Sequence, residues 1–288
     1  MDYALVVLIE VLNAVAVLVL VSAGLAVIFG MMKVINIAQG EFLMLGAYAA
    51  IIAVHAGLNI WLAMFVAAPL AVGLFGLVVE ACLIRFLYGR MLDSLLATWG
   101  LSLFMIGGVT LVFGNTMEGL ATPLGGFEIG AYHSSWYTLV MIAVAVVLLA
   151  AVVGVLRYTR FGLIARGTMQ NPAMAAGLGI SPPKVYLATF GIGSALAGLA
   201  GALLAPMTGV VPSMGAAFIA KAFITVIGGG ASIVTGMGMA AGFFGAIGQL
   251  GTFAMTPVWG DAAMLFAALL MLRVLPRGIT GRFLRGAI

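Results

Sequence analysis

The sequence predicts an all-α integral membrane protein, a polytopic bundle of eight or nine transmembrane helices with broken or re-entrant segments. Of its 288 residues, 65% are hydrophobic and only 7% are charged, whereas a soluble domain carries about 25% charged residues. Polar surface is too scarce to cover a water-soluble globule, so lipid must be the solvent over most of the surface. The 40 glycines stand mostly inside apolar runs, where they favour close contact between helices. We expect one transmembrane domain over residues 1–288.

Apolar runs follow one another along the chain, and each is continuous. Strands of a membrane barrel would alternate apolar and polar residues over about 10 positions, so the runs predict helices. They cover residues 4–32, 42–58, 61–84, 94–114, 136–156, 185–206, 218–235, 237–254 and 262–275. The run 218–235 contains Lys221 and a glycine triplet, so it is either a full span or a broken, re-entrant helix. The first run is long enough to span a bilayer, which takes roughly 20 residues, and we interpret it as a span rather than a signal peptide.

Basic residues predict the orientation, because they are enriched in cytoplasmic connections. They gather in two connections and at the C-terminus: Arg85 and Arg90; Arg157, Arg160, Arg166 and Lys184; and Arg273, Arg277, Arg282 and Arg285. The connection 115–135 carries Glu118, Glu128 and His133 but no Lys or Arg. We therefore expect the N-terminus outside and the C-terminus in the cytoplasm.

The first polar interruption, Lys33–Glu41, separates two apolar runs with almost no loop. Asn36, Gln39 and Glu41 supply amide and carboxylate groups, and Gly40 allows a sharp departure of the backbone. Because unpaired polar groups are costly in hydrocarbon, we expect these side chains to face a cavity, a partner subunit or water. The alternative is an ordinary cytoplasmic turn.

A short helix is predicted inside the basic connection 157–184. Asn171 is an N-cap followed by Pro172, a favoured first helical residue, and Gly177 or Gly179 can end the helix with a left-handed cap. Its apolar residues are Ala173, Met174, Ala176 and Leu178. A helix this short is marginal in water and must dock on something. We interpret it as a docking helix for a cytoplasmic partner, and the alternative is a helix lying on the membrane surface.

Small residues also recur at helical spacing and in one triplet. The spaced sets are Ser194, Gly198 and Ala202, and Gly238, Gly242 and Ala246. They favour packing inside the subunit over a dimer seam. The triplet Gly228, Gly229 and Gly230 would unwind a helix at membrane depth, as in discontinuous helices that line transport sites. A flexible cytoplasmic loop is the alternative.

Charged residues inside or beside the apolar runs are Glu10, Glu80 and Lys221. Such residues are functional by default, although Glu10 and Glu80 lie close enough to run ends to snorkel or to pair. No phosphate-binding loop, zinc-protease motif or serine-hydrolase motif is present in the sequence. We expect no catalytic residue, metal or cofactor in this chain, and we expect energy for active transport to come from a separate ATP-binding polypeptide.

Four stretches, in this order, resemble the permeases of branched-chain amino acid ABC transporters. They are Gly24–Tyr48, Thr159–Ile180, Gly193–Pro206 and Gly228–Gly245. The resemblance covers most of the chain from about residue 20 to about residue 280, and it is closest to the shorter, first-type permease of the high-affinity importer. The sequence departs from the family at Gly167-Thr168, where Ala-Val is frequent, and at Gln39, where His is frequent.

The resemblance implies a fold like that of the type II importers and a role in forming the translocation pathway. The implied partners are a second, homologous permease, two cytoplasmic ATP-binding cassette subunits and an extracytoplasmic substrate-binding protein, in a bacterial-type plasma (inner) membrane and without nucleic acid. The pore-proximal motif maps onto Asn36, Gln39, Gly40 and Glu41, and we assign the triplet Gly228, Gly229 and Gly230 to the same pathway. The ATPase-coupling segment maps onto Arg160, Gly162, Arg166, Asn171, Pro172, Met174, Ala175, Gly177 and Gly179.

The substrate implied is a branched-chain amino acid or a related small solute, and the alternative within the family is urea or a short-chain amide. The pore segments carry no clear charged clamp, which fits a zwitterionic or neutral solute. A self-sufficient channel or secondary transporter is the alternative of another class. The capped helix within residues 166–180 disfavours it, because a channel does not require a docking helix. A membrane enzyme is disfavoured because no catalytic constellation is present.

Overall fold

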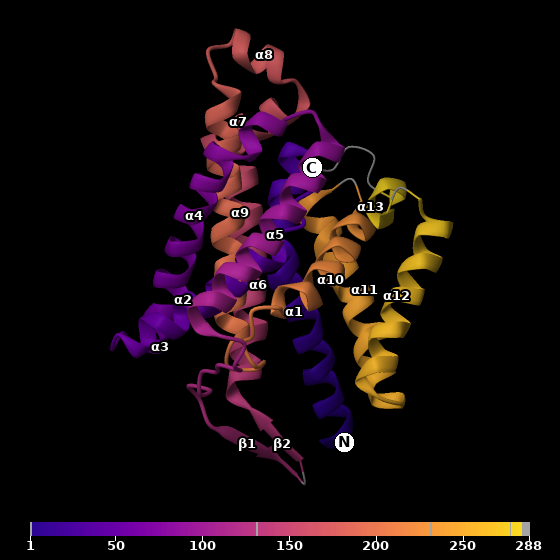
Figure 1. Cartoon of the computed structure of the whole chain (residues 1–288). Helices are drawn as coiled ribbons and strands as arrows, with labels where there is room; N and C mark the ends of the chain where they lie inside the picture. The colour runs from indigo at the N-terminus through magenta and orange to yellow at the C-terminus, as the bar shows by residue number, and fades with distance from the viewer. Residues whose placement is uncertain (1, 131, 231, 277, 284–288) are drawn as a thin grey trace. The chain divides into compact units, whose positions relative to one another are not determined.

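The structure, a computed structural model, describes residues 2–130, 132–230, 232–276 and 278–283. Helices account for most of these residues (Figure 1). The longer ones are α1 (Asp2–Met32), α2 (Gln39–His55), α4 (Ala68–Cys82), α5 (Met91–Phe113), α6 (Trp136–Tyr158), α9 (Pro182–Leu204), α10 (Met214–Gly229), α11 (Ile233–Ala254) and α12 (Pro257–Val274). The shorter ones are α3 (Ile60–Leu62), the π-helical η1 (Ala63–Ala67), the 3₁₀-helical η2 (Ile84–Leu87), α7 (Arg160–Gln170), α8 (Pro172–Gly177) and α13 (Gly278–Phe283).

Six helices in the described part of the chain are long and apolar enough to cross a membrane, and a seventh span results if α10 and α11 count as one bent span. The helix α2 is apolar but has only 17 residues. The polytopic helical fold is therefore confirmed, whereas a count of eight or nine crossings is not. The elements α3, η1 and α4 follow one another without a break, so the expected run 61–84 forms one span that contains a π-helical turn.

The chain divides into two compact units. Unit 1 comprises residues 1–22, 121–149 and 221–288, and unit 2 comprises residues 23–120 and 150–220. The helices α1, α6 and α10 each run from one unit into the other. That residues 1–288 act as one transmembrane domain stays a prediction.

Unit 2 is built around α9, which packs against α2 and α4 through small residues. A Cβ atom at Gly46 would lie 2.2 Å from the carbonyl oxygen of Gly198, and one at Gly76 would lie 2.2 Å from the hydroxyl of Ser194. Backbones can approach this closely only where the side chains are small. The repeat that begins at Ser194 therefore serves packing inside the subunit, as the sequence predicts.

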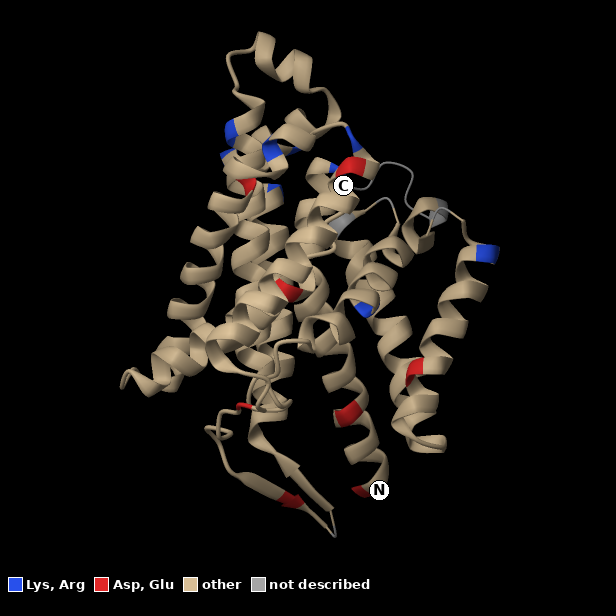
Figure 2. Ribbon diagram, in the orientation of Figure 1, with Lys and Arg blue, Asp and Glu red and all other residues tan. Residues whose placement is uncertain are grey.

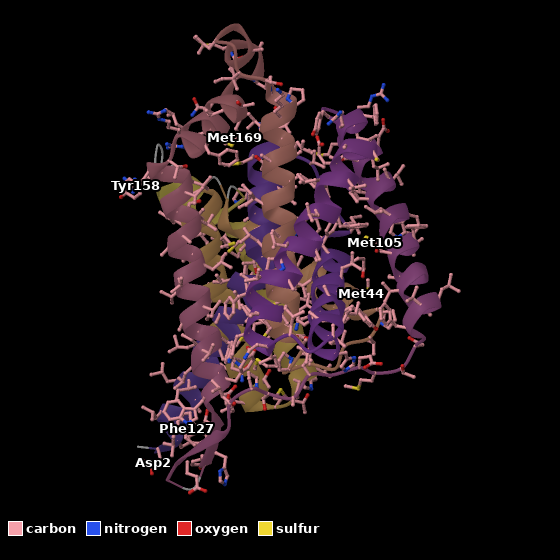
Figure 3. The ribbon with its side chains drawn as sticks, turned by 90° about the vertical axis from the view of Figure 1, so that its left-hand side faces the viewer. Asp2, Met44, Met105, Phe127, Tyr158 and Met169 are labelled. Atoms are coloured by element: carbon pink, nitrogen blue, oxygen red, sulfur yellow. The ribbon has the colours of Figure 1, made fainter. Side chains whose placement is uncertain are left out.

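Unit 1 contains a two-stranded sheet that the sequence analysis did not predict. Strand β1 (Gly126–Ile129) pairs antiparallel with β2 (Tyr132–Ser135), so that Glu128 lies opposite His133. The ring of Tyr132 lies 5.9 Å from that of Tyr3, at the start of α1. Figure 3 shows Phe127 of the hairpin and Asp2 of α1 at the same end of this unit. Strands of four residues are too short for an alternating pattern to stand out between apolar helices.

Unit 1 also contains α11 and α12, which form a tight antiparallel pair. A Cβ atom at Gly260 of α12 would lie 2.0 Å from the hydroxyl of Thr252 of α11. The second repeat of small residues, on α11, is packed more loosely. A Cβ atom at Gly238 would lie 3.4 Å from Leu149, and one at Gly242 would meet no described atom within 4 Å.

Candidate functional site

The polar segment before α2 is folded into the interior of unit 2. Asn36 and Gln39 are 0% and 2% exposed, and the Asn36 side-chain amide donates a hydrogen bond to the Gln39 carbonyl oxygen at 3.2 Å. The Asn36 Oδ1 and Gln39 Nε2 atoms are left without a hydrogen-bond partner among the described residues. These side chains are buried against neighbouring residues of their own unit. That they face a cavity, a partner subunit or water stays a prediction.

Glu41 lies two residues further on, on the side of α2 that packs against α5. Its carboxylate accepts a hydrogen bond from the Ser102 hydroxyl at 3.0 Å, and the second carboxylate oxygen, Oε2, has no hydrogen-bond partner in the described part of the chain. Gly40 and Gly215 touch through their backbones, since a Cβ atom at Gly40 would lie 2.4 Å from the Gly215 carbonyl oxygen. The start of α10 therefore covers the Glu41 carboxylate. Figure 3 labels Met44 of α2 and Met105 of α5, both of which are buried in the same unit.

Two hydroxyl residues of α5 hold this segment, and the sequence analysis missed both. The Thr98 hydroxyl accepts a hydrogen bond from the backbone N–H of Ile37 at 3.1 Å and lies 3.3 Å from the carbonyl oxygen of Ile35. Ser102 contacts Glu41 as described above. The signal was the spacing of Ser94, Thr98 and Ser102 at every fourth position of an apolar run, which puts three hydroxyls on one buried face.

A second polar cluster lies at the end of α4. Glu80 is fully buried, accepts a hydrogen bond from the Tyr88 hydroxyl and lies 3.6 Å from the Arg85 guanidinium. Burial and the hydrogen bond to Glu80 raise the pKa of Tyr88 above its usual value. Glu80 therefore pairs, as its place near the end of a run predicts. The cluster adjoins a cavity of about 600 Å³ whose lining includes Lys33, Tyr88, Arg90, Met169, Pro172 and Tyr186.

The ends of α1 and α7 meet around this cavity, together with the starts of α5, α8 and α9. Figure 2 shows the Lys and Arg residues of unit 2 gathered at the end that carries α7 and α8. The basic connections of this unit thus share one end, as a common side of the membrane requires. Arg277 and Arg285, part of the basic C-terminus, lie outside the described residues.

The predicted docking helix is present, and a longer helix that the sequence analysis did not single out precedes it. The Thr159 hydroxyl caps α7 by accepting a hydrogen bond from the N–H of Gly162 at 3.1 Å. A Cβ atom at Gly162 would lie 2.4 Å from the carbonyl oxygens of Val155 and Leu156, so only glycine allows α7 to fold back this closely on the end of α6. Arg160 is exposed and Arg166 is half-buried, with its Nε donating to the Gly162 carbonyl oxygen at 3.3 Å.

The caps of α8 follow the sequence prediction. The Asn171 side chain accepts a hydrogen bond from the N–H of Met174 at 3.0 Å, and Pro172 is the first helical residue. Gly179, with φ of 84°, supplies the left-handed position after the helix, while Gly177 is its last residue.

Two large apolar side chains are exposed, one on the six-residue helix α8 and one on the residue that follows it. Met174 and Leu178 are 67% and 75% exposed, whereas Ala175 is only 5% exposed. Ala175 therefore packs against its own chain, and its role as a docking residue stays a prediction. Met174 and Leu178 remain available to a partner.

The glycine triplet ends a helix, as predicted. The helix α10 stops at Gly229, α11 starts at Ile233, and the two are bent by 119°. Gly230 has φ of 83°, which favours glycine because the left-handed region is strained for other residues. A Cβ atom at Gly228 would lie 2.6 Å from the Phe244 ring, and one at Gly229 would lie 2.6 Å from Gly236. The triplet thus packs against α11 within unit 1, while Asn36, Gln39, Gly40 and Glu41 belong to unit 2.

Residues 7–275 match the family model described as the branched-chain amino acid transport system permease component. The chain belongs to this permease family. It is 28% identical to the high-affinity branched-chain amino acid transport system permease protein LivH of Escherichia coli (strain K12), over 91% of each chain. It is also 28% identical, over 91% of each chain, to the corresponding protein BraD of Pseudomonas aeruginosa.

A more distant relative of this permease is archaeal. The chain is 27% identical to the probable branched-chain amino acid transport permease protein LivH of Methanocaldococcus jannaschii, over 92% of this chain and 88% of the relative. No solved structure gives a significant match. The resemblance read from the sequence is confirmed, and the chain is a transport permease with several apolar spans.

Proposed function

We propose that this permease forms part of the translocation pathway of an ATP-driven importer for branched-chain amino acids. The relatives' names specify these substrates. The structural observation that supports an importer over a channel is α8, a capped helix that exposes the Met174 side chain and is followed directly by the exposed Leu178. An exposed helix of six residues keeps its shape only through tertiary or partner contacts.

The partners that we propose are a second, homologous permease, two cytoplasmic ATPase subunits and an extracytoplasmic binding protein. ATP is bound and hydrolysed by the ATPase subunits, so the permease itself needs no cofactor. The α7–α8 segment contacts an ATPase subunit, and we keep Arg160, Arg166 and Met174 as its coupling residues because they are accessible or half-accessible at that end of unit 2.

In the proposed orientation the N-terminus is outside and the α7–α8 end is cytoplasmic, in a bacterial-type inner membrane. Two features support it. The Lys and Arg residues of unit 2 gather at the α7–α8 end, and the hairpin β1–β2 carries Glu128 and His133 without any Lys or Arg. Cytoplasmic connections favour basic residues over translocated ones.

We propose two segments for the substrate pathway, Asn36–Glu41 in unit 2 and Gly228–Gly230 in unit 1. The first is supported by amide and carboxylate atoms that are buried without partners among the described residues, because such atoms are costly inside a membrane protein and are retained for function. The second is supported by the helix break, since discontinuous helices of this kind line transport sites in other transporters.

The test is uptake by proteoliposomes that contain the permease, its partner permease and both ATPase subunits, with the binding protein added outside. We expect leucine uptake that requires both ATP inside and the binding protein. Uptake by the permease alone, without ATP, would identify a channel or secondary transporter. Uptake of urea or acetamide in place of leucine would support an importer whose substrate is urea or a short-chain amide.

A further inference from the structure

The break between α10 and α11 leaves backbone groups that neither helix can satisfy. The last carbonyl groups of one helix and the first N–H groups of the next have no partner within their own helix. Ser232 precedes α11 and could cap it, but its hydroxyl is hydrogen-bonded to that of Thr235 and caps no N–H. The break therefore needs a partner from elsewhere in the chain.

That partner is Thr280 of α13. Its hydroxyl donates a hydrogen bond to the carbonyl oxygen of Gly229 at 2.6 Å, and it accepts one from the backbone N–H of Ser232 at 3.1 Å. A hydroxyl can serve as donor and acceptor at once, so one side chain joins the end of α10 to the start of α11. Thr280 is 0% exposed, which places the bridge away from solvent.

The backbones around the bridge fit so closely that glycine is required on both sides. Gly278 has φ of 73°, and a Cβ atom there would lie 2.5 Å from the Cα of Gly230. A Cβ atom at Gly236 of α11 would lie 3.0 Å from the Thr280 hydroxyl. The segment 278–280 is thus seated against the break through backbone as well as side-chain contacts.

We propose that α13 is a latch on the broken helix and that Thr280 is the positioning residue that sets the geometry of the break. Through Thr280, the C-terminal segment controls the conformation of Gly228–Gly230 in the substrate pathway. That last step rests on the proposed assignment of these glycines to the substrate pathway. The bridge itself rests only on the hydrogen bonds and close backbone contacts within unit 1.

The experiment compares Thr280→Val with Thr280→Ser in the full chain, assembled with its partners. Valine matches threonine in shape but has no hydroxyl, whereas serine keeps it. Because two buried backbone groups lose their partner in the valine variant, we expect uptake to fall about tenfold. The serine variant should stay within about twofold of the wild type. Equal uptake by the two variants would overturn the proposal that Thr280 controls the glycine triplet in the substrate pathway.

A second readout needs neither substrate nor ATP. In a Cys82→Ala background, a cysteine at Ile227, close to the break and 46% exposed, reports on its geometry, and one at Val258, 77% exposed on α12, serves as the control. We expect Thr280→Val to change the rate of maleimide labelling at position 227 by about threefold or more, and to leave position 258 unchanged. Thr280→Ser should leave both rates unchanged.

Unchanged labelling at position 227 in the valine variant would overturn the latch. A change at both positions would mean that unit 1 loosens as a whole, which would also count against a local latch. Altered labelling at position 227 with normal uptake would retain the latch and reject the assignment of the glycine triplet to the pathway, so failures of the two proposals are distinguishable.

Discussion

The Glu41 carboxylate accepts a hydrogen bond from the Ser102 hydroxyl, 3.0 Å away, and so joins the start of α2 to the middle of α5. Glu41 is 3% exposed, and among the residues that the structure describes its carboxylate meets a hydroxyl and a glycine rather than a cation. A carboxylate inside a membrane protein carries a desolvation cost that packing alone does not require. Substitutions of these two residues therefore test whether the carboxylate is needed for transport rather than for assembly of the complex.

Glu41→Gln should reduce substrate uptake about tenfold, the factor that corresponds to about 1.4 kcal/mol, while the complex stays assembled. Glutamine has nearly the same size and can still accept the Ser102 hydrogen bond, so only the ionisable group is lost. Uptake and ATPase retention are measured on the same preparation. Ser102→Ala is the matched control, because it removes the hydrogen bond and keeps the carboxylate. Normal uptake by a correctly inserted Glu41→Gln protein would favour an ordinary turn at this segment.

Gly201→Ala should destabilise the permease by about 1–3 kcal/mol, the usual effect of overpacking a core. A Cβ atom at Gly201 of α9 would lie 1.8 Å from the Leu43 carbonyl oxygen of α2, so a backbone must move. Gly242→Ala is the control, since a Cβ atom there meets no described atom within 4 Å. Thermal unfolding of the purified complex provides the measurement. Equal midpoints for the two variants would show that α9 has room to shift.

Met174→Asp should uncouple ATP hydrolysis from transport more severely than Asn171→Ala. Met174 is exposed on α8, and a charge there becomes buried in the proposed interface at a cost of several kcal/mol. Loss of the Asn171 cap costs about 1 kcal/mol, which docking can absorb. Substrate-stimulated ATPase activity and retention of the ATPase on purification are the readouts, with Met174→Leu as the control.

Ala175→Asp is unsuitable as a second test of docking, because Ala175 is buried against its own chain. A charge there would disturb the fold of the permease itself. If Met174→Asp keeps the ATPase bound and fully stimulated, α8 is not the docking element.

Cysteine labelling should place the hairpin and α8 on opposite sides of the membrane. With the exposed Cys82 replaced by alanine, Gly125→Cys should react with an impermeant maleimide added to the outside of spheroplasts. Leu178→Cys, at a position that is 75% exposed, should react only after the membrane is opened. Labelling of position 125 from the cytoplasmic side alone would reverse the proposed orientation.

Local signals in the sequence predicted the segments whose geometry depends on neighbours along the chain. Asn171, Pro172 and Gly179 specify α8 because capping is a matter of a few adjacent residues. The break after Gly229 was likewise visible, because consecutive glycines weaken a helix whatever surrounds it.

What the sequence could not provide was the identity of the distant partners. The contacts of Glu41 with Ser102, and of Gly229 with Thr280, join positions that are 61 and 51 residues apart. Ser102 and Thr280 look like ordinary small polar residues until a fold brings them to their partners. The hairpin was missed for a related reason, since pairing between two four-residue strands is decided by the turn and by contacts with α1.

The close packing of α9 also constrains which changes in length the protein can accept. Inserting one residue near the middle of α9 would rotate everything beyond it by about 100°, so Gly198 would turn away from Gly46 and bulkier neighbours would meet backbone in its place. Deleting one residue from that helix would likewise turn Gly198 away from Gly46. In the described part of the connection 114–135, the closest fits are made by flexible side chains, since those of Met117 and Asp2 lie where Cβ atoms at Gly209 and Gly130 would be, and Glu118 bridges Val210. Relatives of different length should therefore gain or lose residues in that connection and keep the spacing within α9 unchanged.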